Sequence, residues 1–308
     1  MSNVFLAKKT IAAIDAAIEA DQGATYRQHL QKVLPHIKDA YRGAEESPFR
    51  LHLGASIVGG ECGRKIWYSF RWATVSKFPG RILRLFNRGH LEEARVIAAV
   101  LTIGVQVFQQ DENGNQFRIS DAGGHFGGSG DGILLGVPDL APEQYCILEC
   151  KTHNDSSFKK LIKDGVRNSK FEHYVQMNVY LRKMGLAVAM YVAVNKNDDS
   201  LYMELVPLNS EIADQFIDRG QQIVFMRDPP KRISDSPGWF ACSWCDHKPV
   251  CHLKAAPARN CRTCVHSVPR EDGNWYCTEE SANAAFGDNV QLSEAAQLRA
   301  CQQYKVFF

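Results

Sequence analysis

GGHFGGSGDGILLGV at residues 123–137 and QYCILECK at residues 144–151 are the two stretches that decide the fold of this chain. The glycines of the first stretch predict a turn, and the run that begins at Gly132 predicts a strand. The second stretch predicts a buried strand, because an apolar run extends to Leu148.

The two stretches carry three charged residues at positions that suggest a shared site. Asp131 ends the glycine-rich turn, and Glu149 and Lys151 flank Cys150 on the second strand. Strand side chains alternate, so Glu149 and Lys151 share one face and Cys150 points to the other. If the two strands are neighbours, the three charges converge. The alternative is a surface hairpin with scattered charges, but the apolar run before Glu149 favours an interior position, where an unpaired charge is costly.

Converging carboxylates indicate a metal site. Two carboxylates at one place repel each other unless a cation neutralises them. Oxygen ligands favour Mg²⁺ or Mn²⁺. A lysine beside the metal could position or deprotonate a water molecule and offset the charge that develops on a phosphate.

These residues resemble the PD-(D/E)xK nuclease superfamily. Gly130-Asp131 stands for its first half-motif and Glu149-Cys150-Lys151 for its second. Gln176-Met-Asn-Val-Tyr180 resembles the QxxxY helix of the RecB-like branch, and the two named side chains are one helical turn apart. The resemblance implies an α/β restriction-endonuclease-like core, with a central mixed sheet flanked by helices, that hydrolyses DNA phosphodiester bonds.

The resemblance also implies a role for each residue. Asp131 and Glu149 would hold the metal, with the Cys150 carbonyl as a further ligand; Lys151 would orient or activate the attacking water. Gln176 would assist, and Tyr180 would support it. In Gly89-His90-Leu91-Glu92-Glu93, the fourth position after Gly89 resembles the helix glutamate of the lambda-exonuclease style. Glu93 is thus the expected third acidic ligand, His90 is the near alternative, and Glu92 is expected on a solvated face.

Composition limits the class of protein. The 308 residues are 45% hydrophobic and 23% charged, which is an ordinary globular balance, and the net charge of +2 excludes a polycation. No run approaches the roughly 20 apolar residues of a membrane helix, and no leader with a cleavage site is evident. We expect a cytoplasmic protein of a bacterial or phage-infected cell, with no membrane partner.

The chain is expected to have three parts: a helical region at 1–50, the nuclease core at 51–256 and a zinc-binding module at 257–308. Periodicity and turn residues predict the elements of the first two parts. Helices are expected at 11–20, 26–42 with a break at Pro35, 83–101, 173–184 and 210–227, and a hairpin at 190–207; 156–170 is expected to be a basic helix or loop.

Four cysteines form a first cluster around the core. Cys242, Cys245 and Cys251 follow a CxxCx5C spacing, and Cys62 lies far upstream. This arrangement resembles the 4Fe–4S staple of AddB-type and CRISPR-associated RecB-like nucleases. Closing so long a loop would stabilise the fold through chain entropy. The alternative is a zinc site in which His247 or His252 is the fourth ligand.

A second cluster lies in the tail. Cys261, Cys264, Cys277 and Cys301, with a hairpin-like insert at Asp272-Gly273-Asn274, resemble a zinc ribbon or treble clef, with His266 as a possible substitute ligand. A structural role is favoured because residues 257–308 contain little apolar material. The two remaining cysteines, Cys146 and Cys150, are expected to be inert strand thiols.

Two basic segments are candidates for DNA contact. Residues 62–91 hold seven basic residues and no acidic ones, and Trp67, Tyr68 or Trp72 could stack on bases of a frayed end. The alternative, expected for most aromatic residues of this segment, is a place in the core. A second basic group follows Lys151, with a solvated helix face as the alternative. The expected DNA-binding residues are Arg64, Lys65, Arg71, Arg81, Arg84, Arg88, Lys159 and Lys160, with Lys163, Arg167 and Lys170 in the second group.

The sequence therefore predicts a metal-dependent deoxyribonuclease. An exonuclease at double-stranded DNA ends or single strands, in recombination, repair or phage DNA processing, is favoured; a single-strand annealing or recombination protein is a possible partner. One alternative is a CRISPR-adaptation or structure-specific endonuclease. The other is a non-catalytic DNA- or protein-binding module, against which the intact Asp131, Glu149 and Lys151 argue.

Overall fold

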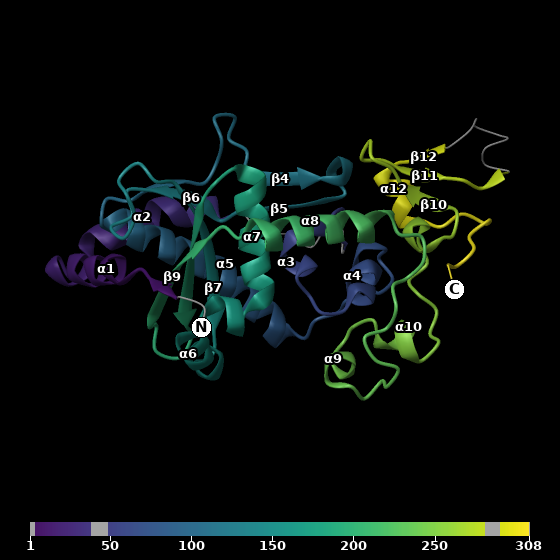
Figure 1. Cartoon of the computed structure of the whole chain (residues 1–308), viewed down its shortest axis with the longest axis horizontal. Helices are drawn as coiled ribbons and strands as arrows, with labels where there is room; N and C mark the ends of the chain where they lie inside the picture. The colour runs from purple at the N-terminus through teal and green to yellow at the C-terminus, as the bar shows by residue number, and fades with distance from the viewer. Residues whose placement is uncertain (1–3, 38–48, 281–289, 308) are drawn as a thin grey trace. The chain divides into compact units, whose positions relative to one another are not determined.

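A computed structural model describes residues 4–37, 49–280 and 290–307. Its contacts form two compact units that interleave along the chain (Figure 1). Unit 1 comprises Met1–Glu46, Phe78–Ile119 and Ser129–Asp214, and unit 2 comprises Ser47–Lys77, Ser120–Gly128 and Gln215–Phe308. Each unit is described separately.

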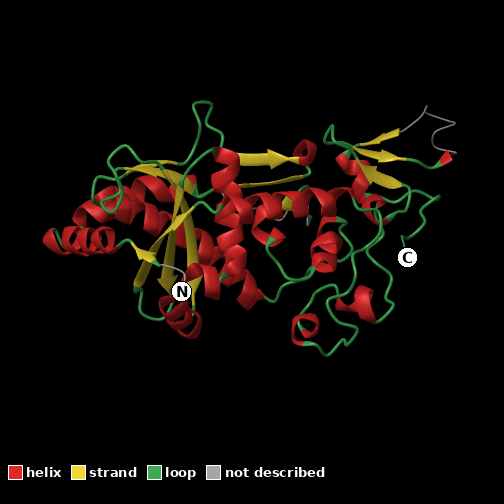
Figure 2. Cartoon of the chain, viewed as in Figure 1, coloured by secondary structure: helices red, strands yellow, loops and turns green. Residues whose placement is uncertain are grey.

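Unit 1 is built on a six-stranded mixed sheet in the order β1-β9-β8-β7-β6-β3. Figure 2 draws the strands in yellow and the helices in red. Its strands are β1 (Phe5–Leu6), β3 (Gln106–Phe108), β6 (Gly132–Leu135), β7 (Cys146–His153), β8 (Val188–Asn195) and β9 (Leu201–Pro207). β7 and β8 pair in parallel, and the other neighbours pair antiparallel. The parallel pair lies at the centre, where both faces are covered, which agrees with the apolar character of β8.

Helices cover both faces of this sheet. One face packs with α1 (Lys8–Ala20), α2 (Ala24–Val33) and α5 (Gly80–Thr102), and the other carries α6 (Asp155–Ser169) and α7 (Phe171–Met184). The alternation of β7 buries Cys146 and Leu148 in the first layer and turns Glu149 toward α7. The expected central mixed sheet flanked by helices is confirmed.

Most expected elements of unit 1 are present with shifted ends. The helix expected at 83–101 is α5, the one at 173–184 is α7, and the uncertain 156–170 segment is the helix α6. The segment expected at 26–42 ends as α2 at Val33 and continues as a short 3-10 turn, Leu34–His36, that contains Pro35; residues 38–42 lie outside the described part. The hairpin expected at 190–207 is β8 with β9.

Unit 2 contains two small sheets and short helices. β2 pairs in parallel with β5, and β10, β11 and β12 form an antiparallel sheet that includes the expected hairpin at Asp272–Asn274. The bounds are β2 (Leu53–Gly54), α3 (Ala55–Val58), α4 (Gly63–Phe70), η3 (Ala122–Gly124), β5 (Phe126–Ser129), α9 (Phe240–Ser243), α10 (Lys248–His252), η4 (Cys261–Thr263), β10 (Ser267–Pro269), β11 (Trp275–Cys277), β12 (Val290–Leu292) and α12 (Glu294–Leu298). Three elements, β4 (Arg118–Asp121), β5 and α8 (Ser210–Phe225), include residues of both units.

Two buried arginines tie the tail of unit 2 to its N-terminal segment. The Arg262 guanidinium lies 3.8 Å from the Trp72 ring centroid and donates to the carbonyls of Phe70 and Leu51. Arg71 donates to the carbonyls of Ser267 and Met226. Carbonyl oxygens and aromatic faces thus solvate two cations that burial would otherwise penalise.

The tail packs on aromatic side chains that the sequence suggested for DNA stacking. Trp67, Tyr68 and Trp72 are 0%, 2% and 1% exposed, so none of them is available to a base. The stacking role is therefore wrong. In a segment that is both basic and aromatic, the aromatic side chains can pack in the core while the basic side chains face solvent. Within the described residues, no helix combines the length and apolar character needed to cross a bilayer.

Candidate active site

The Asp131, Glu149 and Lys151 side chains meet at one edge of β6 and β7. Gly132 pairs with Leu148, which brings the preceding Asp131 opposite Glu149. The Cys150 backbone N–H donates to Asp131 Oδ2 at 2.7 Å, and the Lys151 ammonium donates to Glu149 Oε1. The prediction that the two strands are neighbours is confirmed.

Burial and neighbouring charges shift the pKa values of Glu149 and Lys151 in this cluster. The Glu149 side chain is fully buried, and Lys151 is 27% exposed. Burial raises the pKa of Glu149 and the Asp131 charge raises it further, while Lys151 lowers it in part. Burial alone would lower the pKa of Lys151, but the two carboxylates outweigh it and raise that pKa. Each carboxylate thus depends on nearby positive charge.

Gln176 and Tyr180 on α7 complete the polar shell, as the resemblance implied. Gln176 Nε2 donates to Glu149 Oε2 at 3.1 Å and to the Tyr180 hydroxyl at 3.4 Å. That hydroxyl in turn donates to the Ser129 carbonyl at 3.0 Å, two residues before Asp131. The helix and the glycine-rich turn are therefore bonded to the same carboxylate cluster.

Glu93 reaches the cluster from α5 along the wall of a cleft. An open cleft of about 740 Å³ is lined by both Glu93 and Asp131. Glu93 also lies near enough to Cys150 to raise the pKa of its thiol, after the larger contributions of burial and Asp131. His90 is half-buried and is not among the residues that line the cleft. Glu92, expected in solvent, is instead 5% exposed and pairs with Arg95 at 3.1 Å.

The donor set suits a hard divalent cation. Asp131, Glu149 and Glu93 supply carboxylate oxygens, which Mg²⁺ and Mn²⁺ prefer. In the structure the Lys151 ammonium serves as the positive partner of the buried Glu149. Among the described residues, no group of three or more His, Cys, Asp or Glu side chains is already arranged around a metal position.

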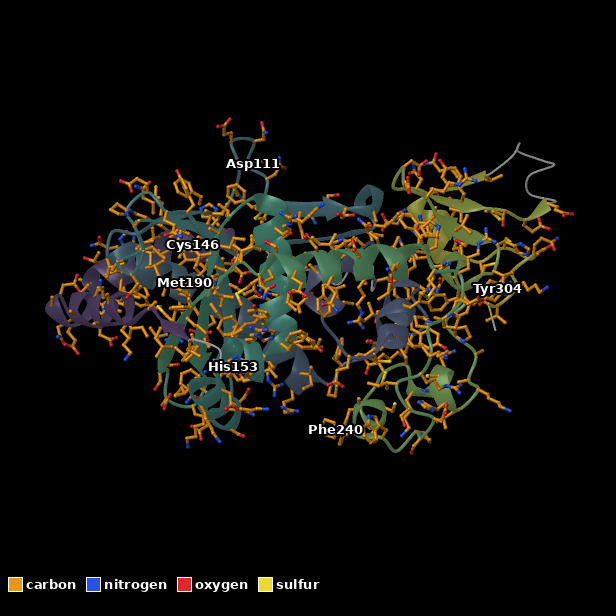
Figure 3. The ribbon with its side chains drawn as sticks, viewed as in Figure 1. Asp111, Cys146, His153, Met190, Phe240 and Tyr304 are labelled. Carbon is orange, nitrogen blue, oxygen red and sulfur yellow. The ribbon has the colours of Figure 1, made fainter. Side chains whose placement is uncertain are left out.

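A hydrogen-bonded chain that the sequence did not reveal lies beside Lys151 (Figure 3 labels His153). The Tyr191 hydroxyl is 2.8 Å from both His153 Nε2 and His173 Nδ1. His153 Nδ1 is 3.2 Å from the Ser157 hydroxyl, which accepts a hydrogen bond from Lys170. Lys170 donates to Ser157, and the side chains of Ser157, His153, Tyr191 and His173 continue from it as one hydrogen-bonded chain. The only sequence signal was the placement of His153 on the same β7 face as Glu149 and Lys151.

The four cysteines of the first cluster all belong to unit 2, and their thiols influence one another in part. Burial raises the pKa of Cys242, and the charges of Cys62 and Cys251 raise it further. The pKa of Cys245 is raised by burial and also by Cys62 and Cys251. Cys62 and Cys251 therefore lie within electrostatic reach of both Cys242 and Cys245.

His247, one alternative ligand of that cluster, is already bound. Its Nε2 lies 2.9 Å from the Ser69 hydroxyl, and its Nδ1 lies 2.9 Å from the Thr74 hydroxyl. The ring is 5% exposed, so it has no free nitrogen for a metal.

The four cysteines of the second cluster also belong to unit 2, and three of them act on the thiol of Cys261. Burial raises the pKa of Cys261 to about 11, with Cys301, Cys264 and Cys277 as further causes in that order. The Lys305 backbone N–H donates to Cys264 Sγ at 3.5 Å, as Lys65 N–H does to Cys62 Sγ at 3.4 Å in the first cluster. Of the two expected strand thiols, Cys146 is buried in the core and Cys150 is half-buried.

The expected DNA-binding residues fall into two groups. Arg71 is 3% exposed and is unavailable to DNA, and Arg64 is half-buried and donates to the Tyr68 hydroxyl at 3.1 Å. The others lie on the surface: Lys65, Arg81, Arg84, Arg88, Lys159 and Lys160. Of the second basic group, Lys163 and Arg167 are also exposed, while Lys170 is half-buried.

No protein-family model and no curated protein matches the chain. Similar solved structures include LHK-Exo in complex with dAMP, at 16% identity over 56% of this chain and 85% of that chain, with a TM-score of 0.41. The alkaline exonuclease LHK-Exo from Laribacter hongkongensis, at 16% identity, covers 56% and 87% with a TM-score of 0.38. SSO0001, at 13% identity, covers 76% and 99% with a TM-score of 0.32. At these values the function must be inferred from the geometry of the site.

Proposed function

We propose that the chain is a Mg²⁺- or Mn²⁺-dependent deoxyribonuclease of the PD-(D/E)xK type that hydrolyses phosphodiester bonds at DNA ends. The observation that carries the proposal is the convergence of Asp131, Glu149 and Lys151 on β6 and β7, with Gln176 donating to Glu149. A surface hairpin with scattered charges would not bury Glu149 completely.

The residues divide the chemistry among themselves. Asp131, Glu149 and Glu93 would hold the cation, which when bound would polarise the scissile phosphate and lower the pKa of a water molecule. Lys151 orients the attacking water and offsets charge that develops on the phosphate. Gln176 keeps the Glu149 carboxylate in one orientation, and Tyr180 fixes Gln176.

The test is cleavage by the full chain with and without Mg²⁺. Lys151→Ala should abolish metal-dependent cleavage of end-labelled linear DNA while leaving DNA binding largely in place. Lys183→Ala, in the last turn of α7, is a matched control that should cleave normally. Normal cleavage by Lys151→Ala would refute the mechanism.

The same assay separates modes of attack. Closed circular DNA should resist the chain, and cleavage of sealed circles would favour a structure-specific or CRISPR-adaptation endonuclease. We assign the end-directed activity to recombination, repair or phage DNA processing, with DNA ends and a single-strand annealing or recombination protein as the partners to test.

We further propose that both cysteine clusters bind metal. Cys62, Cys242, Cys245 and Cys251 are the proposed ligands of a 4Fe–4S cluster, and Cys261, Cys264, Cys277 and Cys301 are those of Zn²⁺. Support comes from the mutual influence of the thiols and from backbone N–H groups that donate to sulfur. The hydrogen bonds of His247 argue against it as a zinc ligand in place of Cys62.

A further inference from the structure

One wall of the cleft that holds Glu93 and Asp131 is a hairpin, residues 108–118, whose tip carries Asp111 (Figure 3). Phe108 ends β3, and Gln110 pairs with Gln116 across the hairpin. The inference below concerns what this wall binds, and it rests on the proposed nuclease function.

Hydrogen bonds within the hairpin stabilise its turn. Asp111 Oδ1 accepts the backbone N–H groups of Asn113 and Asn115, both at 2.9 Å, and Asp111 N–H donates to the Asn115 carbonyl at 2.8 Å. Gly114 has a φ of +76°, a left-handed conformation that suits glycine in a tight turn. The backbone of the wall is therefore held in a defined conformation.

The hairpin is also bonded to the turn that carries Asp131. Gln116 Nε2 donates to the Gly130 carbonyl at 3.2 Å, and the Gly130 N–H donates to the Phe117 carbonyl at 3.1 Å. These two hydrogen bonds fix the position of the hairpin relative to Asp131.

The wall presents amides and an aromatic ring where a phosphate-binding surface would present cations. Gln109, Gln110, Asn115 and Gln116 line the cleft, while Arg118 is the one lysine or arginine among the lining residues that the structure describes. Asp111 and Glu112 add negative charge at the tip. A phosphate backbone laid along this wall would meet more negative than positive charge.

Amides and an exposed ring are suited to bases. Side-chain amides donate and accept in the plane of a base edge. Phe108 is 37% exposed, and its ring lies 6.2 Å from that of Tyr145, which is 46% exposed. Exposed rings of this kind are stacking surfaces for unpaired bases, which offer a free face.

We propose that residues 108–118 bind the bases of an unpaired DNA strand, with Phe108 stacking on one base and the amides contacting base edges. The strand's phosphate then lies at Glu93 and Asp131, and the bases face the hairpin. A paired duplex does not fit this mode, since its base faces are stacked and its outer surface is phosphate.

The test uses the full chain carrying Lys151→Ala, so that DNA stays intact in Mg²⁺. Fluorescence anisotropy gives the Kd for a labelled single strand and for the same strand with abasic sites, which keeps the phosphates and removes bases. Phe108→Ala and the abasic strand should each weaken binding by about tenfold. The abasic strand loses the Phe108 stack together with the amide contacts, so Phe108→Ala should weaken its binding little further.

Phe5→Ala is the matched control, since Phe5 is 51% exposed on β1, at the opposite edge of the sheet from β3. It should leave both Kd values unchanged. Phe108→Leu keeps the bulk and removes the aromatic face, so a loss there with an unchanged circular dichroism spectrum excludes misfolding as the cause.

Three outcomes overturn the proposal: equal affinity for intact and abasic strands, equal losses for Phe108→Ala and Phe5→Ala, or tighter binding of a duplex than of the single strand. If the wild-type chain nevertheless cleaves DNA, the nuclease assignment stands and only the base-binding wall fails. If it neither binds nor cleaves DNA, both proposals fail.

Discussion

The Tyr180 hydroxyl is the atom that joins α7 to the turn before Asp131. It donates to the Ser129 carbonyl and receives Gln176 Nε2. We expect Tyr180→Phe to lower the free energy of unfolding by about 1 kcal/mol, because one buried carbonyl loses its partner. The cleavage rate should fall as well, since Gln176 loses its support.

Tyr174→Phe is the control for this change, because Tyr174 is a buried tyrosine of the same helix whose hydroxyl has no hydrogen bond among the described residues. Urea midpoints and single-turnover rates of both variants measure the effect. Equal values for the two variants would contradict the role given to the Tyr180 hydroxyl.

Two glycines with the same backbone conformation test close packing in unit 2. Gly123 has a φ of +66°, and an added Cβ would lie 2.1 Å from the Glu271 carbonyl oxygen. Gly185 has a φ of +68° with nothing within 4 Å. Gly185→Ala should cost about 1 kcal/mol for the left-handed conformation, and Gly123→Ala clearly more, because backbone must move. Thermal unfolding of both variants measures the two stability losses. Similar losses would show that the turn at Gly123 can move to accommodate the added methyl group.

At the same scale, sequence reasoning predicted which side chains converge at β6 and β7 but misjudged several neighbours. Strand alternation and the one-turn spacing of Gln176 and Tyr180 are local rules, and the structure obeys them. The burial of Glu92 and Arg71 depends on which helix face meets the core, and charge alone does not reveal that face.

Among the elements, β7 was the most predictable, because its apolar run favours a buried central strand over a surface hairpin. The hairpin at residues 108–118 was not recognised as a cleft wall. Its amides carry no periodic apolar pattern, and its importance arises only when β3 pairs with β6 and brings it to Asp131.

The chain formed by His153, Tyr191 and His173 predicts acid sensitivity of β7, β8 and α7. Burial, with Lys170 as the next cause, lowers the pKa of His153 to about 4; burial and then Lys151 lower that of His173 to about 3. Both values lie below the unfolded value of about 6.5, so the unfolded state binds protons first as the pH falls. The contribution of these two histidines to stability should be constant above pH 6.5 and fall between roughly pH 6.5 and 4.

We expect His153 to contribute roughly 3 kcal/mol to that fall, since the ring is 6% exposed and one pKa unit corresponds to about 1.4 kcal/mol. Urea unfolding from pH 7.5 to 4.5 measures it. His153→Gln should flatten the profile, and His29→Gln on α2 should not. A wild-type profile unchanged by His153→Gln would mean that other groups cause the acid loss.

At the scale of the whole chain, cysteines that are distant in sequence influence one another in the structure. Cys62 and Cys242 are far apart in the chain, yet the charge of Cys62 acts on the thiols of both Cys242 and Cys245. Spacing alone identified the CxxC pairs. Assigning Cys62 as the fourth member depended on the family resemblance, because its local sequence holds no second ligand.

The final prediction concerns removal of that fourth ligand. Cys62→Ser should remove the iron-dependent visible absorbance of anaerobically purified protein and lower the free energy of unfolding by on the order of 4 kcal/mol, because a shared metal closes a loop of more than 100 residues. Zinc content should stay near one per chain, since the second cluster keeps its four thiols. Cys146→Ser, at a fully buried thiol outside both clusters, is the control: it should cost stability without changing metal content. A colourless wild-type protein that contains only zinc would reject the iron–sulfur assignment, and full iron content in Cys62→Ser would exclude Cys62 as a ligand.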